Sequence, residues 1–277
     1  MTLSAASFCL MTVFVKLAGS SLSTIQIVFV RGTFTLIATG ILIFRESIYP
    51  FGNHKRLLAA RGIIGTLALF LVYESIKIFP LSEATVIQYL FPIFTALGAA
   101  LIISEPLNKN IFGAIMVGLF GVYTVLGFPF LVTETNINLY SVGIAIAGSF
   151  LTGVAYVLVR QATKVNEHPL VVMFYFPLFT VPMCLPLLLS NWVHPTLEEW
   201  GFLLLVGVCT QLGQFFLTYG YKELPAAKAA PLSYVQVPFA MIMGAIFFEE
   251  VISLTFIIGS LLVLLSIIIV MSKKLEK

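Results

Sequence analysis

The chain has 277 residues, of which 60% are hydrophobic and only 10% are charged. Soluble domains carry about 25% charged residues, so this composition excludes a soluble globular domain. The formal net charge of +3 gives no indication of a nucleic-acid partner, and we expect none.

Long apolar runs recur from one end of the chain to the other. A helix needs roughly 20 mainly apolar residues to cross the bilayer core. We therefore predict an all-α integral membrane protein with ten transmembrane helices and short connections. The ten runs are residues 2–18, 23–45, 57–78, 82–104, 110–128, 139–160, 168–190, 199–221, 226–248 and 251–271.

The positions of the basic residues predict the orientation. With a cytoplasmic N-terminus, twelve of the 15 Lys and Arg fall on or near cytoplasmic helix ends. Lys16 and Lys77 fall on the opposite side, and Arg31 falls inside the membrane. The positive-inside rule thus favours a multi-pass protein of the inner (plasma) membrane with both termini in the cytoplasm. The first run has no basic n-region and no small-residue cleavage site, so we do not interpret it as a signal peptide.

Two stretches of the chain, residues 81–105 and 226–250, share one pattern. Each begins with small residues and contains a proline, a glycine six residues later and a closing glutamate: Pro92, Gly98 and Glu105 in the first, Pro238, Gly244 and Glu250 in the second. We interpret this as a duplication, with five helices in residues 1–130 and five in 131–277. An odd number of helices per half gives the halves opposite polarity, and such inverted repeats place a site near the bilayer midplane.

Pro92 and Pro238 lie within the predicted fourth and ninth helices. A proline inside a helix removes a hydrogen-bond donor, frees a carbonyl and kinks the helix. The kink is either a packing feature or a place where the helix borders a cavity or acts as a hinge in gating.

The order of these features resembles the EamA-like members of the drug/metabolite transporter superfamily. The resemblance rests on the Pro92–Glu105 and Pro238–Glu250 patterns and covers nearly the whole chain. The segment that starts Lys16-Leu-Ala-Gly and continues to Arg31-Gly is similar to S-adenosylmethionine uptake carriers and the solute carrier 35 G group. Many members carry Trp-Gly in the first helix, where this chain has Leu10-Met11-Thr12, so no cavity contact of that Trp carries over. The resemblance implies the fold more strongly than the substrate.

Arg31 is the outstanding ionisable residue, since charged groups at the middle of a membrane are costly and usually face a cavity or a partner. Its guanidinium stays protonated, so it needs a carboxylate, carbonyls or an anionic ligand. One alternative is a structural pair with Glu74, or a side chain that reaches the membrane surface. The other is that Arg31 binds a carboxylate or phosphate of a substrate. Glu74 is also a candidate for proton coupling.

A second set of intramembrane residues is polar but neutral. Amides in hydrocarbon must hydrogen-bond, either across helices or to a ligand, and aromatic rings offer stacking faces. Interhelical hydrogen bonding is the alternative to a role in binding for each of them. The candidate substrate-binding residues of this kind are Gln88, Tyr89, Tyr156, Tyr175, Gln211, Gln214, Tyr234 and Gln236.

Several motifs of other protein classes are absent from the sequence. It has no G-x-x-x-x-G-K-[ST] loop, no H-E-x-x-H and no G-x-S-x-G, and its three histidines are far apart. We therefore predict neither an enzyme nor a cofactor or metal site.

Together these features predict a secondary transporter for a small organic metabolite that works by alternating access. An amino acid, a nucleoside such as S-adenosylmethionine, or a carboxylate are the candidate substrates, and coupling to protons or to a counter-substrate stays open. The alternatives are a channel or passive pore and a flippase for a lipid-linked intermediate.

Overall fold

A computed structural model of the chain describes residues 1–19, 21–78, 81–128, 131, 139–188, 192–249 and 253–272. All longer elements within these residues are helices. Those of the first half are α1 (Thr2–Ala18), α2 (Thr24–Arg45), α3 (Lys55–Ile78), α4 (Leu81–Gln88), α5 (Phe91–Ile102) and α6 (Lys109–Val125). Those of the second half are α7 (Leu139–Lys164), α8 (Pro169–Leu188), α9 (Leu197–Glu223), α10 (Ala226–Ala229), the 3-10 helix η2 (Ala230–Val235), α11 (Gln236–Phe248) and α12 (Leu254–Ser272). Glu250, which closes the second copy of the repeated pattern, lies outside the described residues.

Eight helical segments of the described chain are long and apolar enough to cross a membrane. The prediction of an all-helical membrane protein is therefore confirmed. The helices α1 and α6 are also apolar, but each has 17 residues. At 1.5 Å per residue they are about 25 Å long, less than the roughly 30 Å of the hydrocarbon core.

Two of the predicted helices are interrupted rather than merely kinked. In the fourth, α4 ends at Gln88 and α5 begins at Phe91, with Pro92 in its first turn. In the ninth, the helix passes through α10 and η2 before α11, which has Pro238 in its first turn. A proline lacks the N–H that would continue the hydrogen-bond ladder, and its ring crowds the carbonyl four residues earlier. The helix therefore starts afresh close to each proline.

The described chain forms two compact units, each built from a piece of both halves of the sequence. The first unit comprises Met1–Thr66 and Leu158–Lys222, and the second comprises Leu67–Val157 and Glu223–Lys277. The boundaries between the units fall within α3 and α7 and at the end of α9.

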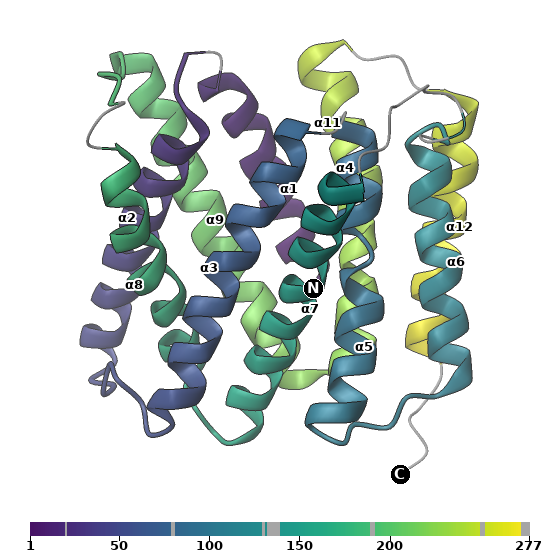
Figure 1. Cartoon of the computed structure of the whole chain (residues 1–277), viewed down its shortest axis with the longest axis horizontal. Coiled ribbons are helices and arrows are strands. Elements are labelled where there is room, and N and C mark those ends of the chain that lie inside the picture. The colour runs from purple at the N-terminus through teal and green to yellow at the C-terminus, as the bar shows by residue number, and fades with distance from the viewer. Residues whose placement is uncertain are drawn as a thin grey trace. The chain divides into compact units, whose positions relative to one another are not determined.

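The first unit is organised around α2 and α8, which lie side by side (Figure 1). A Cβ added to Gly32 of α2 would come within 3.2 Å of a methyl group of Val181 in α8, so the glycine allows the two helices to approach. The hydroxyl groups of Thr66 in α3 and Thr180 in α8 are hydrogen-bonded at 2.9 Å. These contacts hold α8 between α2 and α3.

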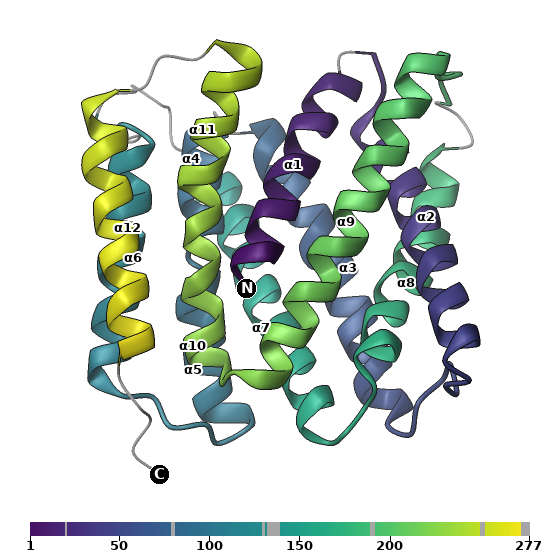
Figure 2. The same cartoon turned by 180° about the vertical axis from the view of Figure 1, so that it is seen from behind.

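The second unit is organised around α6 and α12, which are adjacent along their length in both views (Figure 2). A Cβ added to Gly121 would come within 2.9 Å of the carbonyl oxygen of Gly259 and the amide nitrogen of Val263. Ser266 Oγ donates a hydrogen bond to the carbonyl oxygen of Ala114 at 2.6 Å. Small residues thus bring the two backbones into contact, as is common where helices pack within a membrane.

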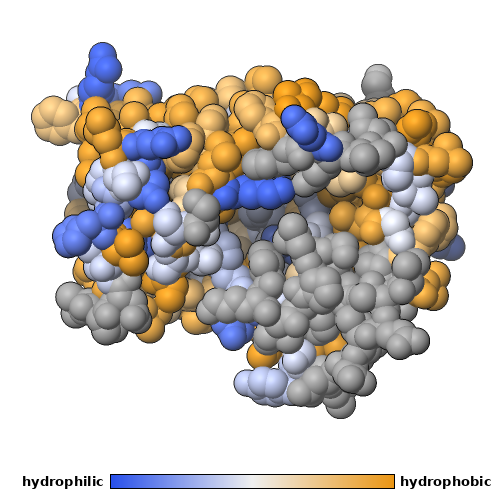
Figure 3. Space-filling model, turned by 90° about the horizontal axis from the view of Figure 1, so that it is seen from above, coloured by the Kyte–Doolittle hydropathy of each residue, from blue (hydrophilic) through white to orange (hydrophobic). Residues whose placement is uncertain are grey.

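Hydrophobic side chains cover much of the outer helix surface. Figure 3 looks onto one end of the helices, where hydrophilic residues gather while the flanks are mainly hydrophobic. On α12 the exposed residues include Ile257, Leu261, Leu264 and Ile268. A surface of this kind suits contact with lipid chains rather than with water.

Candidate substrate-binding site

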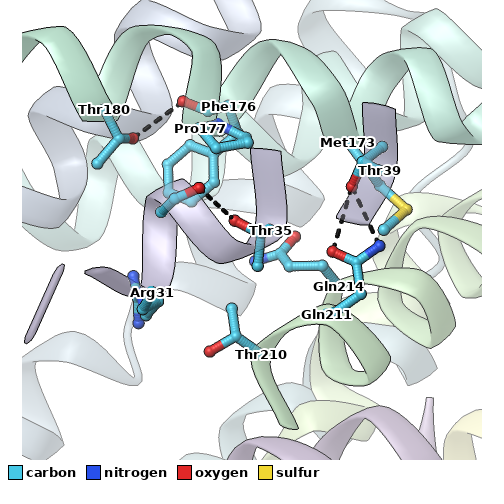
Figure 4. A pocket seen from close by; sticks show the side chains of 11 residues that line it. Arg31, Thr35, Thr39, Met173, Phe176, Pro177, Thr180, Thr210, Gln211 and Gln214 are labelled. Atoms are coloured by element: carbon cyan, nitrogen blue, oxygen red, sulfur yellow. Dashed lines mark hydrogen bonds between the residues drawn. The ribbon is translucent and has the colours of Figure 1, made fainter. Parts of the chain in front are cut away.

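A pocket lies within the first unit between α2, α8 and α9 (Figure 4). The space inside it that a water molecule can enter is about 10 Å³, enough for a single water, so the lining must move apart to admit a larger ligand. One lining residue is charged, six are neutral and polar, and four are non-polar. They are Arg31, Gly32, Thr35, Thr39, Met173, Phe176, Pro177, Thr180, Thr210, Gln211 and Gln214.

The α2 side of the pocket is a polar stripe with helical spacing. The helix begins after Ser23, whose side chain accepts a hydrogen bond from the backbone of Gln26 at 3.3 Å. Arg31, Thr35 and Thr39 follow at intervals of four residues. Residues four apart lie on one face of a helix, so all three side chains point to the same side of α2.

Arg31 is buried, with an exposed fraction of 8%. Its one hydrogen bond to a described residue runs from Nη1 to the sulfur of Met11, at 3.6 Å. A thioether is a weak acceptor, whereas a guanidinium has five N–H donors. The charge of Arg31 is therefore poorly compensated by the residues of its own unit.

A hydrogen-bonded pair joins α2 to α9 at the other end of the pocket. Gln211 Nε2 donates to Thr39 Oγ1 at 3.0 Å, and the same hydroxyl lies 3.2 Å from Gln211 Oε1. The hydroxyls of Thr35 and Thr180 donate to carbonyls of their own helices (Figure 4). These groups are largely engaged within the protein.

Thr210 and Gln214 differ from these residues, because their side-chain polar groups have no hydrogen-bond partner among the described residues. The Thr210 hydroxyl is buried and has no hydrogen-bond partner among the described residues. No hydrogen bond joins the Gln214 amide to any other residue of the described chain. Buried polar groups normally have partners, so the buried Thr210 hydroxyl is available to a ligand or to water, and the half-buried Gln214 amide lies beside it in the lining.

Phe176 forms an apolar wall of the pocket. The guanidinium of Arg61, a buried residue of α3, lies 4.8 Å from the centre of the Phe176 ring. A cation over an aromatic face is an attractive arrangement, which helps to fix the ring. Arg61 therefore acts on the pocket through Phe176 rather than as a lining residue.

Polar contacts fasten both ends of the helices that carry the pocket. At one end, the fully buried Gln26 side chain donates to the carbonyl of Val193 at 2.6 Å and accepts from its amide at 3.2 Å. At the other, the Glu167 carboxylate accepts from the backbone amides of Asn53 and His54 at 2.8 and 2.5 Å and contacts His54 Nδ1 at 2.8 Å. His54 immediately precedes α3, so Glu167 is placed where a negative charge stabilises the start of that helix.

Among the residues predicted from the sequence, Arg31, Gln211 and Gln214 lie in this one pocket. Tyr175 belongs to the same unit but does not line the pocket, because its hydroxyl donates to the carbonyl of Phe51 at 3.0 Å. Glu74 belongs to the second unit and has an exposed side chain near the end of α3. A pair between Arg31 and Glu74 stays a prediction.

The remaining predicted residues belong to the second unit. Tyr89 and Tyr234 have ring centres 5.8 Å apart, and Tyr156 packs edge-on against Phe91 at 5.2 Å. The two half-buried amides flank the helix interruptions: Gln88 is the last residue of α4, and Gln236 is the first of α11.

Side chains of the second unit satisfy the carbonyls that the first interruption exposes. Pro92 has no N–H to offer to the carbonyl of Gln88, and Ser149 Oγ donates to that carbonyl instead, at 2.9 Å. The next carbonyl, of Tyr89, accepts from the Tyr234 hydroxyl at 3.3 Å. A backbone group without a partner is costly at membrane depth, so both side chains help to maintain the interruption.

The described part of the chain contains no group of three or more His, Cys, Asp or Glu residues that could hold a metal ion. Several residues that line the pocket were missed by the sequence reasoning, chiefly Thr35, Thr39 and Thr210. The intervals of four residues from Arg31 to Thr39 were a signal that was present in the sequence.

Apolar helices, interruptions within two of them and a buried polar pocket together define a solute-handling membrane protein. The chain belongs to the EamA-like transporter family, whose model matches residues 1–127 and again residues 139–272. The resemblance found from the sequence is thereby confirmed, and the chain is a membrane transporter.

Curated relatives of the chain are transporters too. The pseudopaline exporter of Pseudomonas aeruginosa is 28% identical over 95% of this chain and 91% of its own length. Human solute carrier family 35 member G1 is 28% identical over 78% of this chain and 62% of its own length. The S-adenosylmethionine uptake transporter of Rickettsia prowazekii is 25% identical over 63% of this chain and 58% of its own length.

The fold is also similar to that of a protein solved by crystallography. The two structures agree with a TM-score of 0.81 over 98% of this chain and 96% of the other. Their sequence identity is 16%, so this likeness concerns the fold alone.

Proposed function

We propose that the chain is a secondary transporter that moves a small organic metabolite by alternating access, with Arg31 as the anchor for an anionic group of the substrate. The observation that carries this proposal is the environment of Arg31. It is a buried cation that lines a polar pocket, and Met11 supplies its one described hydrogen bond, through a weak acceptor.

Elementary electrostatics favours an anion at this position. Removing a charged side chain from water is expensive unless it gains a partner. An anion 4 Å from a cation contributes about 4 kcal/mol of attraction at the effective dielectric constant of roughly 20 that describes protein sites. A substrate carboxylate or phosphate at Arg31 would thus offset the free-energy cost of burying the guanidinium.

The architecture proposed for the carrier has ten transmembrane helices in two inverted repeats, 1–130 and 131–277. Three observations support it. The family model matches the chain twice, the fourth and ninth helices are interrupted next to equivalent prolines, and α1 and α6 are apolar helices just short of a full span. The distribution of Lys and Arg supports an inner (plasma) membrane location with both termini in the cytoplasm.

The second unit has two proposed roles in this mechanism. The interruptions at Pro92 and Pro238 would act as joints when the carrier changes its access. The polar and aromatic groups beside them would contact the substrate along its path: Gln88, Tyr89, Tyr156, Tyr234 and Gln236. Glu74 is the proposed site of proton coupling. The named relatives include an exporter and an uptake transporter, so the family leaves the direction of transport free.

The test is uptake by proteoliposomes that contain the purified full chain. A labelled panel of amino acids, nucleosides and carboxylates would be offered with and without internal unlabelled solute and with and without a pH gradient. We expect saturable uptake that internal solute accelerates. Flux that never saturates would instead indicate a pore, and flux of lipids alone would indicate a flippase.

The role of Arg31 is tested in the same assay with Arg31→Gln. We expect transport efficiency to fall about 100-fold, because loss of one partner of a buried charge pair costs several kcal/mol. Arg45→Gln is the matched control, since Arg45 lies at the exposed end of the same helix. Normal transport by Arg31→Gln would remove Arg31 as the anchor.

A further inference from the structure

We infer that the substrate of the Arg31 pocket carries a net charge of −1 and is a small monocarboxylate with a hydroxyl, keto or amide group and no ammonium group. This inference rests on the proposed function, because it takes the pocket as the binding site. It goes further because it favours such monocarboxylates over free amino acids and over cationic substrates.

The first argument is the charge of the pocket lining. Arg31 is the one charged residue among the eleven that line it. A substrate with one net negative charge therefore balances the one charge of the lining, while Arg61, behind Phe176, adds a second positive charge nearby. A neutral or cationic substrate leaves an uncompensated positive charge in a buried site, where charges are expensive.

The second argument concerns an ammonium group. An ammonium has three donors and no acceptor, and when it is buried it requires acceptors of good quality. The lining offers it no carboxylate, only hydroxyl and amide oxygens, and the best placed of these are already shared between Thr39 and Gln211. Arg31 in the same pocket adds repulsion between like charges. Free amino acids should therefore bind less well than the corresponding hydroxy acids.

The third argument concerns the groups that remain open. The Thr210 hydroxyl and the Gln214 amide can each donate and accept a hydrogen bond, and neither has a partner among the described residues. In Figure 4 both side chains lie between Arg31 and the Thr39–Gln211 pair. A carboxylate on Arg31 would place a neighbouring hydroxyl, keto or amide group of the same molecule toward them.

One consequence separates this chain from a named relative. S-adenosylmethionine carries a sulfonium and an ammonium against a single carboxylate, so it would bring net positive charge to Arg31. We expect that this chain does not bind it, although the Rickettsia prowazekii relative is an S-adenosylmethionine uptake transporter.

The test uses three carbon skeletons, each in three charge states. The compounds are lactate, alanine and alaninamide; 2-hydroxy-4-methylpentanoate, leucine and leucinamide; and phenyllactate, phenylalanine and phenylalaninamide. Binding of each to the purified full chain is measured by titration calorimetry at pH 6, where the amides are cationic. For at least one skeleton, we expect the hydroxy acid to bind at least about tenfold more tightly than the amino acid, and the amide not to bind.

Three results would overturn the inference: an amino acid that binds as tightly as its hydroxy acid, an amide that binds at all, or no binding by any of the nine compounds. Titrations of Arg31→Gln, with Arg45→Gln as the control, separate this failure from a failure of the proposed function. If an amino acid binds best and Arg31→Gln abolishes its binding, the inferred net charge of the substrate is wrong, but the proposed role of Arg31 is supported. If the tightest compound binds Arg31→Gln unchanged, the anchor itself is wrong.

Discussion

The two units of the chain are held together in different ways. In the first, buried polar side chains bridge segments far apart in the sequence, as Glu167 does to the start of α3 and Gln26 does to Val193. In the second, the dominant contact is the close approach of the α6 and α12 backbones at Gly121 and Gly259. Buried side-chain hydrogen bonds between distant segments are thus prominent in the unit that carries Arg31, while close glycine packing is prominent in the unit whose helices are interrupted.

On the proposed function, this difference would match different roles of the two units. A binding site needs side chains held in one geometry, and polar contacts with defined partners provide that. A helix that is interrupted within a membrane needs neighbours that satisfy its free carbonyls, and Ser149 and Tyr234 provide these. Mutations should therefore affect the two units through different physical terms.

The largest effect is expected at Glu167 in the first unit. Glu167→Ala removes a buried carboxylate that accepts charge-assisted hydrogen bonds from two backbone amides at the start of α3, which should cost about 3 kcal/mol of unfolding free energy. The apparent melting temperature of the purified chain in detergent measures this. Glu198→Ala is the control, because Glu198 is exposed in the first turn of α9. Equal shifts for the two variants would contradict the importance of the Glu167 contacts.

The next effect tests the packing of the second unit. Gly121→Ala would press a methyl group against two backbone atoms, and we expect a loss of about 2 kcal/mol from overpacking. Gly113→Ala in the same helix meets no atom within 4 Å and should be neutral, or stabilising by up to about 1 kcal/mol. The pair is compared by thermal unfolding. A destabilised Gly113→Ala with a stable Gly121→Ala would reverse the argument.

A smaller effect is expected at Ser149, which serves the interruption before Pro92. Ser149→Ala should cost about 1.5 kcal/mol, because the Gln88 carbonyl loses the donor that compensates for the proline. In a Pro92→Ala background the restored N–H can donate to that carbonyl, so Ser149→Ala should cost less there. Unfolding of the four variants gives the coupling directly. Strictly additive costs would mean that Ser149 does not compensate for Pro92.

The smallest effect concerns the pair that joins α2 to α9 in the pocket. Thr39→Val deprives the Gln211 amide of its partner and should weaken substrate binding about fivefold, the equivalent of one hydrogen bond of about 1 kcal/mol. Thr39→Ser keeps the hydroxyl and should bind normally. The assay is a titration with the tightest ligand of the charge series. Similar affinity for both variants would show that the pair does not shape the site.

The pocket residues that could be predicted from the sequence are those whose side chains are costly to bury in a membrane without a partner. Arg31, Gln211 and Gln214 were identified because charged and amide side chains in an apolar run require partners, and they line one pocket. Threonine gives a weaker signal, because its hydroxyl can be satisfied by a carbonyl of its own helix, as Thr35 shows. Tyr175 was predicted to bind substrate but does not line the pocket. The hydroxyl of a buried tyrosine can instead donate to a backbone carbonyl, here that of Phe51.

The fold was predictable because hydropathy and length specify membrane helices well. Proline chemistry indicated where two of them would be disturbed, although Pro177, Pro182 and Pro186 lie within α8 without ending it. The composition of the two units was not predictable, because it depends on which helices pack together. Residues such as Gly121 and Gly259 determine that packing through contacts that a single sequence does not reveal.

The single charge of the pocket has an electrical consequence. On the proposed function, a bound monoanion would balance the charge of the pocket lining, whereas the lining of the empty site carries the positive charge of Arg31. A unit charge that crosses 100 mV changes its free energy by about 2.3 kcal/mol, and Arg31 would cross part of that field whenever the empty site reorients. Membrane voltage would therefore act on the return of the unloaded carrier and hardly on the loaded step, so a negative cell interior would hold the vacant site facing the cytoplasm.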